Sequence, residues 1–412
     1  MSTPVRISGP AVRGPKLGSW LLAAVALAGV ALAPAVLADP PQVSQAVFDH
    51  YTPASEAVKK GQYAAGLKEG KEALAAAKTS YEKEICLQVI FAAAANSKNY
   101  PEAIDAGEQL VAMPGLAAKS KLDIQKSLGQ MYANTNKFDK AIAITKDYIR
   151  TTGGTAADWA MLANIYGAQQ DCGNALPALD KALAGKSADE GQLNIQSRCF
   201  YKAHDNVKRI AVNEELLKKY PKQSYFNQLS VIYQTDSKLE DLALLELLRF
   251  GFDRDYLTQD TEYQKLADLA LDVGTSAEAQ RVLEKGIAKK LLKSTDTKVA
   301  RLLDQAKTRA LEDKKTLQQI DAEARAGKNG ESDAKAADRY YSLQDYPKVV
   351  EAIQRGLLPD RVGKMKRPDN ANMVLGIALL KLKKNADAAK AFTAAKADPR
   401  MAASARIWLN AT

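Results

Sequence analysis

Apolar residues recur along most of the chain at spacings of three and four positions, which is the period of one face of an α-helix. One order of residue types then returns after 34 positions: a Leu, a small residue directly after it, and a Tyr three positions further on. The two clearest copies are Leu128, Gly129 and Tyr132, then Leu162, Ala163 and Tyr166. No sustained alternation of apolar and polar residues, as in a strand, interrupts this pattern. The pattern therefore predicts an all-α protein made of helix–turn–helix units stacked into a solenoid.

A second helix in each unit is predicted from another small residue, twelve positions after the first. Gly129 is followed in this way by Ala141, and Ala163 is followed by Ala175. We expect the small residues to lie where two helices cross, because a larger side chain there overpacks the crossing at a cost of roughly 1–3 kcal/mol. The positions predicted to pack the repeats are Leu128, Gly129, Tyr132, Ala141, Trp159, Leu162, Ala163, Tyr166, Ala175, Ala267, Ala279, Gly376, Ala388 and Phe392.

The course of the repeat pattern also predicts how the chain is divided. Residues 39–326 are expected to form a larger array, which ends in a charged helical segment at about 289–326 without the small-residue positions. Residues 327–332 contain two glycines among polar residues, which indicates a linker. Residues 333–412 then form a smaller array, and its last helix, near 401–410, is predicted to cap the final repeat.

The first 38 residues have the composition of a secretory signal peptide. Arg6, Arg13 and Lys16 precede an uncharged apolar run at 17–33, and small residues lead up to Ala38. The run is Ala-rich and short against the about 20 residues of a bilayer span, which disfavours the alternative of an uncleaved anchor. We expect cleavage after Ala38, export to the periplasm, and no membrane-spanning segment in the mature chain.

The charge balance limits the class of partner. The chain carries a net charge of +10, and loss of the three basic residues of the signal peptide leaves +7. The basic residues are dispersed among acidic ones, as on solvated helix faces, and form no concentrated stripe of the kind that binds nucleic acid. Nucleic acid is therefore not expected as a partner, while weak attraction to acidic envelope polymers or anionic lipid headgroups stays open.

The cysteines and histidines offer little for catalysis. An exported chain meets oxidising conditions, and a disulfide between Cys172 and Cys199 of neighbouring repeats is predicted, with Cys86 left as a buried thiol. His50 and His204 have no second ligand at metal-binding spacing, and no phosphate loop, nucleophile elbow or zinc motif occurs. We expect no enzyme, no metal and no cofactor, although glycosidase-type carboxylate pairs stay open.

Together these positions resemble the tetratricopeptide repeat family. Residues 122–189 carry most of its pattern, residues 260–293 and 369–402 also match it, and weaker matches extend over most of 47–410. The signal peptide and the Leu-rich sequence before Tyr263 are similar to exported repeat proteins of Gram-negative bacteria, some of them linked to TonB-type outer-membrane transport. The resemblance implies a right-handed superhelical solenoid that binds other proteins.

The resemblance also implies where a ligand lies, because the first helices of successive repeats line a concave groove in this family. The residues at the corresponding positions here are Asp123, Lys126, Gln130, Asn134, Asn164, Asn227, Gln234, Gln264, Asp268 and Asp272. The two-carboxylate clamp of chaperone-binding members is not expected. Lys126 with Gln130 matches only part of it, and the downstream positions near Gly191 and Ile195 carry no basic residue.

We therefore expect a non-enzymatic periplasmic scaffold that binds proteins of the cell envelope through a concave helical groove. Two alternatives stay open. One is a structural component of an envelope transport or export machine, such as one linked to TonB. The other is a protein associated with peptidoglycan or polysaccharide.

Overall fold

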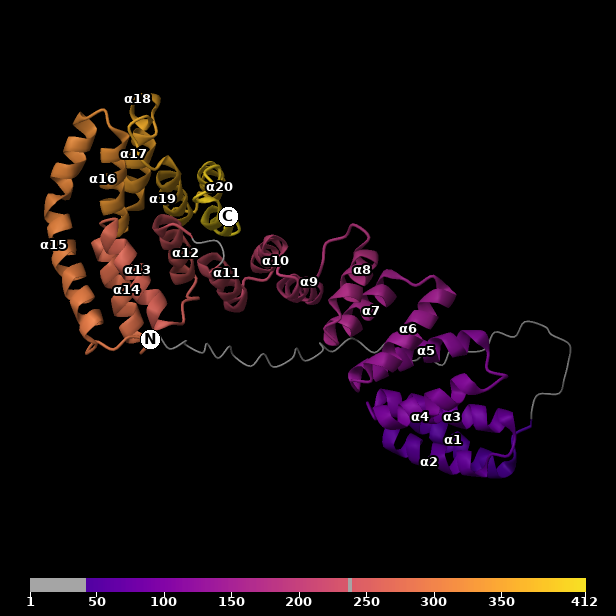
Figure 1. The fold of residues 1–412 in the computed structure, drawn as a ribbon. Coiled ribbons are helices and arrows are strands. Elements are labelled where there is room, and N and C mark those ends of the chain that lie inside the picture. Colours follow the sequence, from indigo (N-terminus) through magenta and orange to yellow (C-terminus); the bar gives the residue numbers. More distant parts are fainter. Residues whose placement is uncertain (1–41, 236–238) are drawn as a thin grey trace, which may run out of the picture. The chain divides into compact units, whose positions relative to one another are not determined.

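The computed structural model describes residues 42–235 and 239–412. Every regular element in these residues is a helix, so the predicted all-α fold is confirmed. The chain divides into two compact units, Met1–Ala188 and Asp189–Thr412 (Figure 1). The predicted signal peptide and its cleavage site at Ala38 lie outside the described residues. Among the helices that are described, none has the length and apolar composition needed to cross a bilayer.

The first unit is a row of helix pairs in which every helix packs on the next one along the chain. Its helices are α1 (Gln45–Lys59), α2 (Tyr63–Ala76), α3 (Ser80–Asn96), α4 (Tyr100–Ala112), α5 (Ala118–Asn134), α6 (Phe138–Thr152), α7 (Ala156–Ala168) and α8 (Cys172–Leu183). Buried apolar side chains from α3 to α7 form one continuous core, which includes Leu128 and Tyr132 of α5. This stacking is the arrangement that a 34-residue pattern predicts.

Polar caps begin several of these helices and tie them to their neighbours. At the start of α3, Thr79 accepts from the backbone N–H of Glu82, and the Glu82 carboxylate accepts in return from the backbone N–H of Thr79. The other Glu82 oxygen accepts from the hydroxyl and the backbone N–H of Ser44, at 2.6 and 2.9 Å, just before α1. The Ser44 hydroxyl and the backbone N–H groups lower the pKa of the Glu82 carboxyl.

A short turn joins the two helices of a pair, and its middle residue has a left-handed backbone. Asn136, Gln170 and His204 occupy this position with φ of 59°, 60° and 54°, and they follow one another at 34-residue intervals. Gly61 and Gly274 occupy it in two other turns. A side chain with a Cβ is strained there by about 1–2 kcal/mol. The geometry of the repeat therefore outweighs the local preference for glycine at several turns.

The second unit contains α9 (Glu190–Lys202), α10 (Asn206–Lys219), α11 (Gln223–Thr235), α12 (Asp241–Asp253), α13 (Asp260–Asp272), α14 (Ser276–Ala288), α15 (Thr297–Ala326), α16 (Gly330–Ser342), α17 (Tyr346–Gly356), α18 (Pro359–Val362), α19 (Pro368–Lys381), α20 (Asn385–Lys396) and α21 (Ala402–Leu409). The charged segment predicted to be helical near 289–326 forms α15, a single helix of 30 residues. Asp296 caps its start by accepting from the backbone N–H groups of Lys298 and Val299. α15 packs against α14 and α16 (Figure 1).

The segment predicted as a linker at 327–332 lies inside the second unit, where residues 327–329 form the turn between α15 and α16 and residues 330–332 begin α16. Gly330, the first residue of α16, is buried. A Cβ on it would lie 2.6 Å from the carbonyl oxygen of Gly356 and 2.9 Å from that of Arg361. The glycine thus permits a close approach of three backbone segments, a role that composition alone does not distinguish from flexibility.

The last helix closes the second unit on itself. α21 packs on α20, as expected of a cap, and also on α12. The Ser404 hydroxyl donates to the carbonyl oxygen of Ala243 (2.6 Å), and the Trp408 indole N–H donates to that of Glu246 (2.8 Å). The buried Trp408 ring also meets Phe250 of α12 edge-on, with 5.2 Å between ring centres. α21 is therefore bonded to residues of α12 that lie 161 and 162 positions earlier in the sequence.

Candidate functional site

The residues predicted to pack the repeats lie inside the two units, and all of them are buried except Trp159, which is half-buried. Gly129 shows why a small residue is needed, since a Cβ there would lie 2.6 Å from the hydroxyl oxygen of Thr145 on α6. At Gly376 of α19, a Cβ would collide with the Phe392 ring of α20. These side chains hold the scaffold together. Candidate binding residues are therefore sought among those that remain at the surface.

Most of the predicted groove residues of the first unit lie along α5. Asp123 and Asn134 are exposed there, and Gln130 is half-buried, as is Asn164 of α7. These four side chains make no hydrogen bond or ion pair with any described residue. Lys126 differs, because its ammonium is paired with a carboxylate of α7. The spacing of three and four residues places the α5 positions on one helical face.

The other predicted groove residues belong to the second unit. Asn227 and Gln234 lie on α11, and Gln264, Asp268 and Asp272 lie on α13. The Gln234 amide donates to the hydroxyl of Ser230 on its own helix, at 2.8 Å. Asp268 lies 3.6 Å from the ammonium of Lys298. That these residues share one groove with those of α5 stays a prediction.

A hollow of about 450 Å³ opens on the first unit between α6, α7 and α8. Buried Ile149, Leu162 and Ala178 give it an apolar base, and the half-buried Trp159 indole lies beside them. This volume is within the range of ~300–1,000 Å³ that is common for ligand sites. None of the residues predicted to line a groove borders this hollow.

Three basic side chains surround the hollow: Lys146 and Arg150 of α6, and Lys181 of α8. The Lys181 ammonium lies 4.1 Å from the centre of the Trp159 ring, a cation–π contact. No carboxylate lines the hollow, so its lining carries an excess of positive charge. Sequence reasoning missed this site because its cations are separated along the chain by acidic residues and have the pattern of a solvated helix face.

A buried charge cluster joins α12, α14 and α16 of the second unit. Arg249 of α12 donates from Nε and Nη2 to the two carboxylate oxygens of Glu278, at 2.9 and 2.6 Å, and from Nη1 to Glu246 at 2.6 Å. The guanidinium carbon also lies 4.4 Å from the centre of the Tyr341 ring. Burial raises the pKa of Glu246 to about 6, against the attraction of Arg249. The contacts of Arg249 with Glu278 and Tyr341 hold α12 to α14 and α16, whereas its contact with Glu246 lies within α12.

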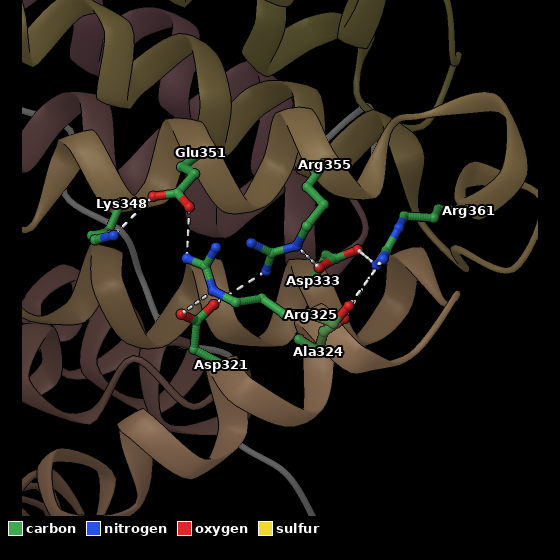
Figure 2. A network of polar contacts seen from close by, with 8 residues as sticks. All are labelled: Asp321, Ala324, Arg325, Asp333, Lys348, Glu351, Arg355 and Arg361. Atoms are coloured by element: carbon green, nitrogen blue, oxygen red, sulfur yellow. Dashed lines mark hydrogen bonds and ion pairs between the residues drawn. The ribbon is translucent and has the colours of Figure 1, made fainter.

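A second ion-pair network connects α15, α16, α17 and α18 around the turn at 327–329 (Figure 2). Fully buried Asp333 accepts from Nε of Arg355 (2.6 Å) and Nη1 of Arg361 (2.9 Å). Arg361 also donates to the carbonyl oxygen of Ala324 at the end of α15, and Arg355 donates to Asp321, both at 3.1 Å. The network fixes the turn between α15 and α16, so we assign it a structural role.

The cysteines are distributed between the two units. Cys86 is a free thiol buried beside Val47 and Ala73, and burial raises its pKa to about 11. A thiol held protonated in this way is a poor nucleophile. Cys172 begins α8 and Cys199 is buried in α9, and their disulfide stays a prediction. Within 42–235 and 239–412, no group of three or more His, Cys, Asp or Glu side chains is placed to hold a metal ion.

No protein-family model and no curated relative matches the sequence. Among solved structures, the chain is similar to a tetratricopeptide repeat protein from Parabacteroides merdae. The identity is 12% and the TM-score 0.38, over 64% of this chain and 99% of that one. It is also similar to the structure of Naa15/Naa10 bound to HypK-THB, with 14% identity and a TM-score of 0.33, over 86% of this chain and 58% of that one.

The repeats are tetratricopeptide-like. The helices themselves carry this conclusion, since turns recur at 34-residue intervals and small residues sit where helices cross. The predicted resemblance is confirmed at the level of the fold. The fold of stacked helix pairs is suited to binding other proteins over an extended surface.

Proposed function

We propose that this protein is a non-enzymatic scaffold that binds other proteins through the surfaces of its helix pairs. The observation that carries the proposal is the polar row on α5. Asp123, Gln130 and Asn134 lie on one helical face and have no partner among the described residues. Stacked helices present such groups in fixed positions, which lowers the ordering cost when an extended peptide segment binds.

We further propose that the chain is exported and acts on proteins of the cell envelope in the periplasm. The basic residues before position 17, the apolar run at 17–33 and the small residues up to Ala38 support export. The mass of the protein purified from the envelope of a Gram-negative host tests this. A chain that starts at Asp39 is expected, and one that keeps residues 1–38 contradicts the proposal.

Crosslinking of the tagged protein in cells, followed by mass spectrometry, tests the scaffold. A reproducible protein partner is expected, and its capture should be lost in the triple variant D123A/Q130A/N134A. The variant K121A is the control, since it removes an exposed residue of the same helix that lies on the face opposite the polar row. Capture that survives the triple variant contradicts binding through α5.

The same experiment separates the two alternatives. Tight co-purification with a membrane complex, unaffected by the α5 variants, favours a structural part of a transport or export machine. Absence of any protein partner, together with pelleting on purified cell-wall sacculi, favours association with peptidoglycan or polysaccharide.

A further inference from the structure

We infer that the hollow between α6, α7 and α8 binds a short acidic peptide segment that carries one bulky apolar side chain. The inference rests on the proposed scaffold function, because such a segment belongs to a protein partner. It concerns a different surface from the polar row, since no residue of α5 lines the hollow. The hollow is therefore a second contact surface, and its lining defines the chemistry of the segment that binds there.

The base of the hollow determines the apolar part of the ligand. Ile149, Leu162 and Tyr166 are buried beneath it, and Trp159 presents a half-buried aromatic surface at its side. Water in such a recess meets few polar groups. Replacing that water by an apolar side chain is favourable because apolar surface leaves water on both partners. A volume of about 450 Å³ accommodates one large side chain with the backbone that carries it.

The surrounding cations determine the sign of the ligand's charge. Neither Lys146 nor Lys181 makes an ion pair with any described residue, and the Lys181 ammonium lies over the Trp159 ring. Arg150 is paired with Asp147 on its own helix, in an exposed contact that a ligand carboxylate can exchange. Carboxylates on either side of the apolar side chain therefore meet positive charge around the hollow.

The carboxylates nearest to this surface are already engaged. Asp139 and Asp147 line a shallower hollow that continues along α6 and shares Lys146 and Arg150 with the first. The Gln169 amide donates to Asp139 at 3.0 Å, and the Gln125 amide donates to Asp147 at 3.2 Å. Both carboxylates keep their negative charge, so the excess of positive charge lies at the first hollow, which Lys146, Arg150 and Lys181 line without a carboxylate.

The lining favours a peptide over an anionic polysaccharide. A sugar chain carries many hydroxyl groups, and each one that is buried needs a hydrogen-bond partner. The neutral polar groups of the lining are the side chains of Asn174 and Tyr166 and the indole N–H of Trp159, and the Asn174 amide already donates to Asp171 at 2.7 Å. An acidic peptide needs fewer such partners, because its apolar side chain fills the base and its carboxylates stay near the cations at the edge.

The test uses the ¹⁵N-labelled full chain and follows its indole N–H signals, with the Trp159 signal assigned through W159F. The probe is the capped peptide Glu-Asp-Phe-Asp-Glu. The comparison probes are Gln-Asn-Phe-Asn-Gln, which lacks charge, Glu-Asp-Gly-Asp-Glu, which lacks the apolar side chain, and trigalacturonate, an anionic sugar. Trp408 is buried in the second unit and serves as the internal control.

The acidic Phe peptide is expected to shift the Trp159 signal in a saturable manner and to leave Trp408 unchanged. K146E/K181E should weaken its affinity at least about ten-fold, whereas K119E/K121E, with the same change of charge on α5, should change it less than about two-fold. If K146E/K181E is poorly folded by circular dichroism, K146Q/K181Q replaces it, with at least about three-fold weakening expected.

Three outcomes overturn the inference: no Trp159 shift with the acidic Phe peptide, equal binding of the uncharged peptide, or tighter binding of trigalacturonate. Its failure is distinguishable from failure of the scaffold proposal. If a partner is captured through α5 but no peptide binds at the hollow, the scaffold proposal is retained and only the site at the hollow is contradicted. If the peptide binds at the hollow but no protein partner is captured in cells, the site is supported and the scaffold proposal is contradicted.

Discussion

The Lys126 ammonium of α5 lies 2.8 Å from Oδ1 of Asp158 at the start of α7. The Lys126 side chain is 47% exposed, whereas that of Asp158 is 1% exposed. A residue predicted from the sequence to contact a ligand thus holds one repeat to the next. Burial alone raises the pKa of Asp158, but the Lys126 ammonium and the donors of Thr155 keep it below its usual value.

Replacing Lys126 by Ala is expected to destabilise the first unit by about 1–2 kcal/mol, because the buried Asp158 carboxylate loses its cation. Urea unfolding at pH 7 measures this, with K121A on the same helix expected to stay within about 0.5 kcal/mol of the wild type. Because the pKa of Asp158 is lowered from 3.8, its contribution is present above that value and is lost as the pH falls. The deficit of K126A should therefore shrink in acid, and a constant deficit contradicts this account.

The carboxyl group of Asp338 on α16 should make the stability of the second unit depend on pH in the sense opposite to that of Asp158. Burial raises its pKa to about 7, the attraction of Arg249 and Arg339 opposes this, and the carboxylates of Glu246 and Glu278 add to the rise. The ordinary value is 3.8, so protonated Asp338 contributes stability that is fully present below about pH 4. That stability is lost as the pH rises through about 7.

The variant D338N, which cannot ionise, should therefore raise the unfolding midpoint of the second unit at about pH 8 and flatten the fall in stability between about pH 4 and 7. Thermal unfolding across this range measures both effects. D304N, which changes an exposed carboxylate of α15, should keep the wild-type profile. A D338N profile parallel to that of the wild type excludes Asp338 as the titrating group.

The network of Figure 2 predicts an unequal response to removal of two carboxylates. D333A should destabilise the second unit by about 3–5 kcal/mol, because Arg355 and Arg361 lose the buried carboxylate that they share. E351A should cost less than about 1 kcal/mol, since the Glu351 side chain is 43% exposed. Denaturant unfolding in a W159F background, followed by Trp408 fluorescence, reports on this unit. A small and equal loss in both variants would show that the network is dispensable.

The turns between helices predict a stabilising substitution. Lys98 is exposed and has φ of 60°, so K98G should stabilise the first unit by about 0.5–1 kcal/mol, as relief of strain exceeds the added freedom of the unfolded chain. K68G, at an exposed position inside α2, should instead destabilise it by about 1 kcal/mol. Thermal unfolding of both variants checks the signs. Loss of stability in K98G would indicate that the left-handed turn carries no strain.

The predicted disulfide is tested by peptide mapping without reduction. A peptide pair that links Cys172 to Cys199 is expected, with Cys86 as the one thiol that reacts with iodoacetamide after denaturation. Cys86 should resist the reagent in the native protein because it is buried and held protonated. Recovery of three reactive thiols from protein purified without reductant rules the disulfide out.

The sequence alone was sufficient to predict the helices and the positions where they cross. Gly129, Ala163 and Ala141 could be placed because a helical period and a 34-residue repeat are local regularities, visible without knowing what lies across the chain. The left-handed turns at Asn136 and Gln170 follow the same 34-residue interval. The same interval is present in the sequence, but polar turn residues carry no apolar pattern that would reveal it.

What a side chain faces was decided only by the tertiary structure. Gly330 has the local sequence of a linker, yet it is buried because the turn after α15 meets the backbone at Gly356. Trp408 was predicted to cap one repeat, but it also bonds to α12. Helix formation depends on neighbours within a few residues, whereas a charge, a small residue or an indole acquires its role from whichever distant helix packs against it. The sequence by itself therefore determined the repeated helix pairs, and packing between distant segments determined the ion pairs, the closed second unit and the basic hollow beside Trp159.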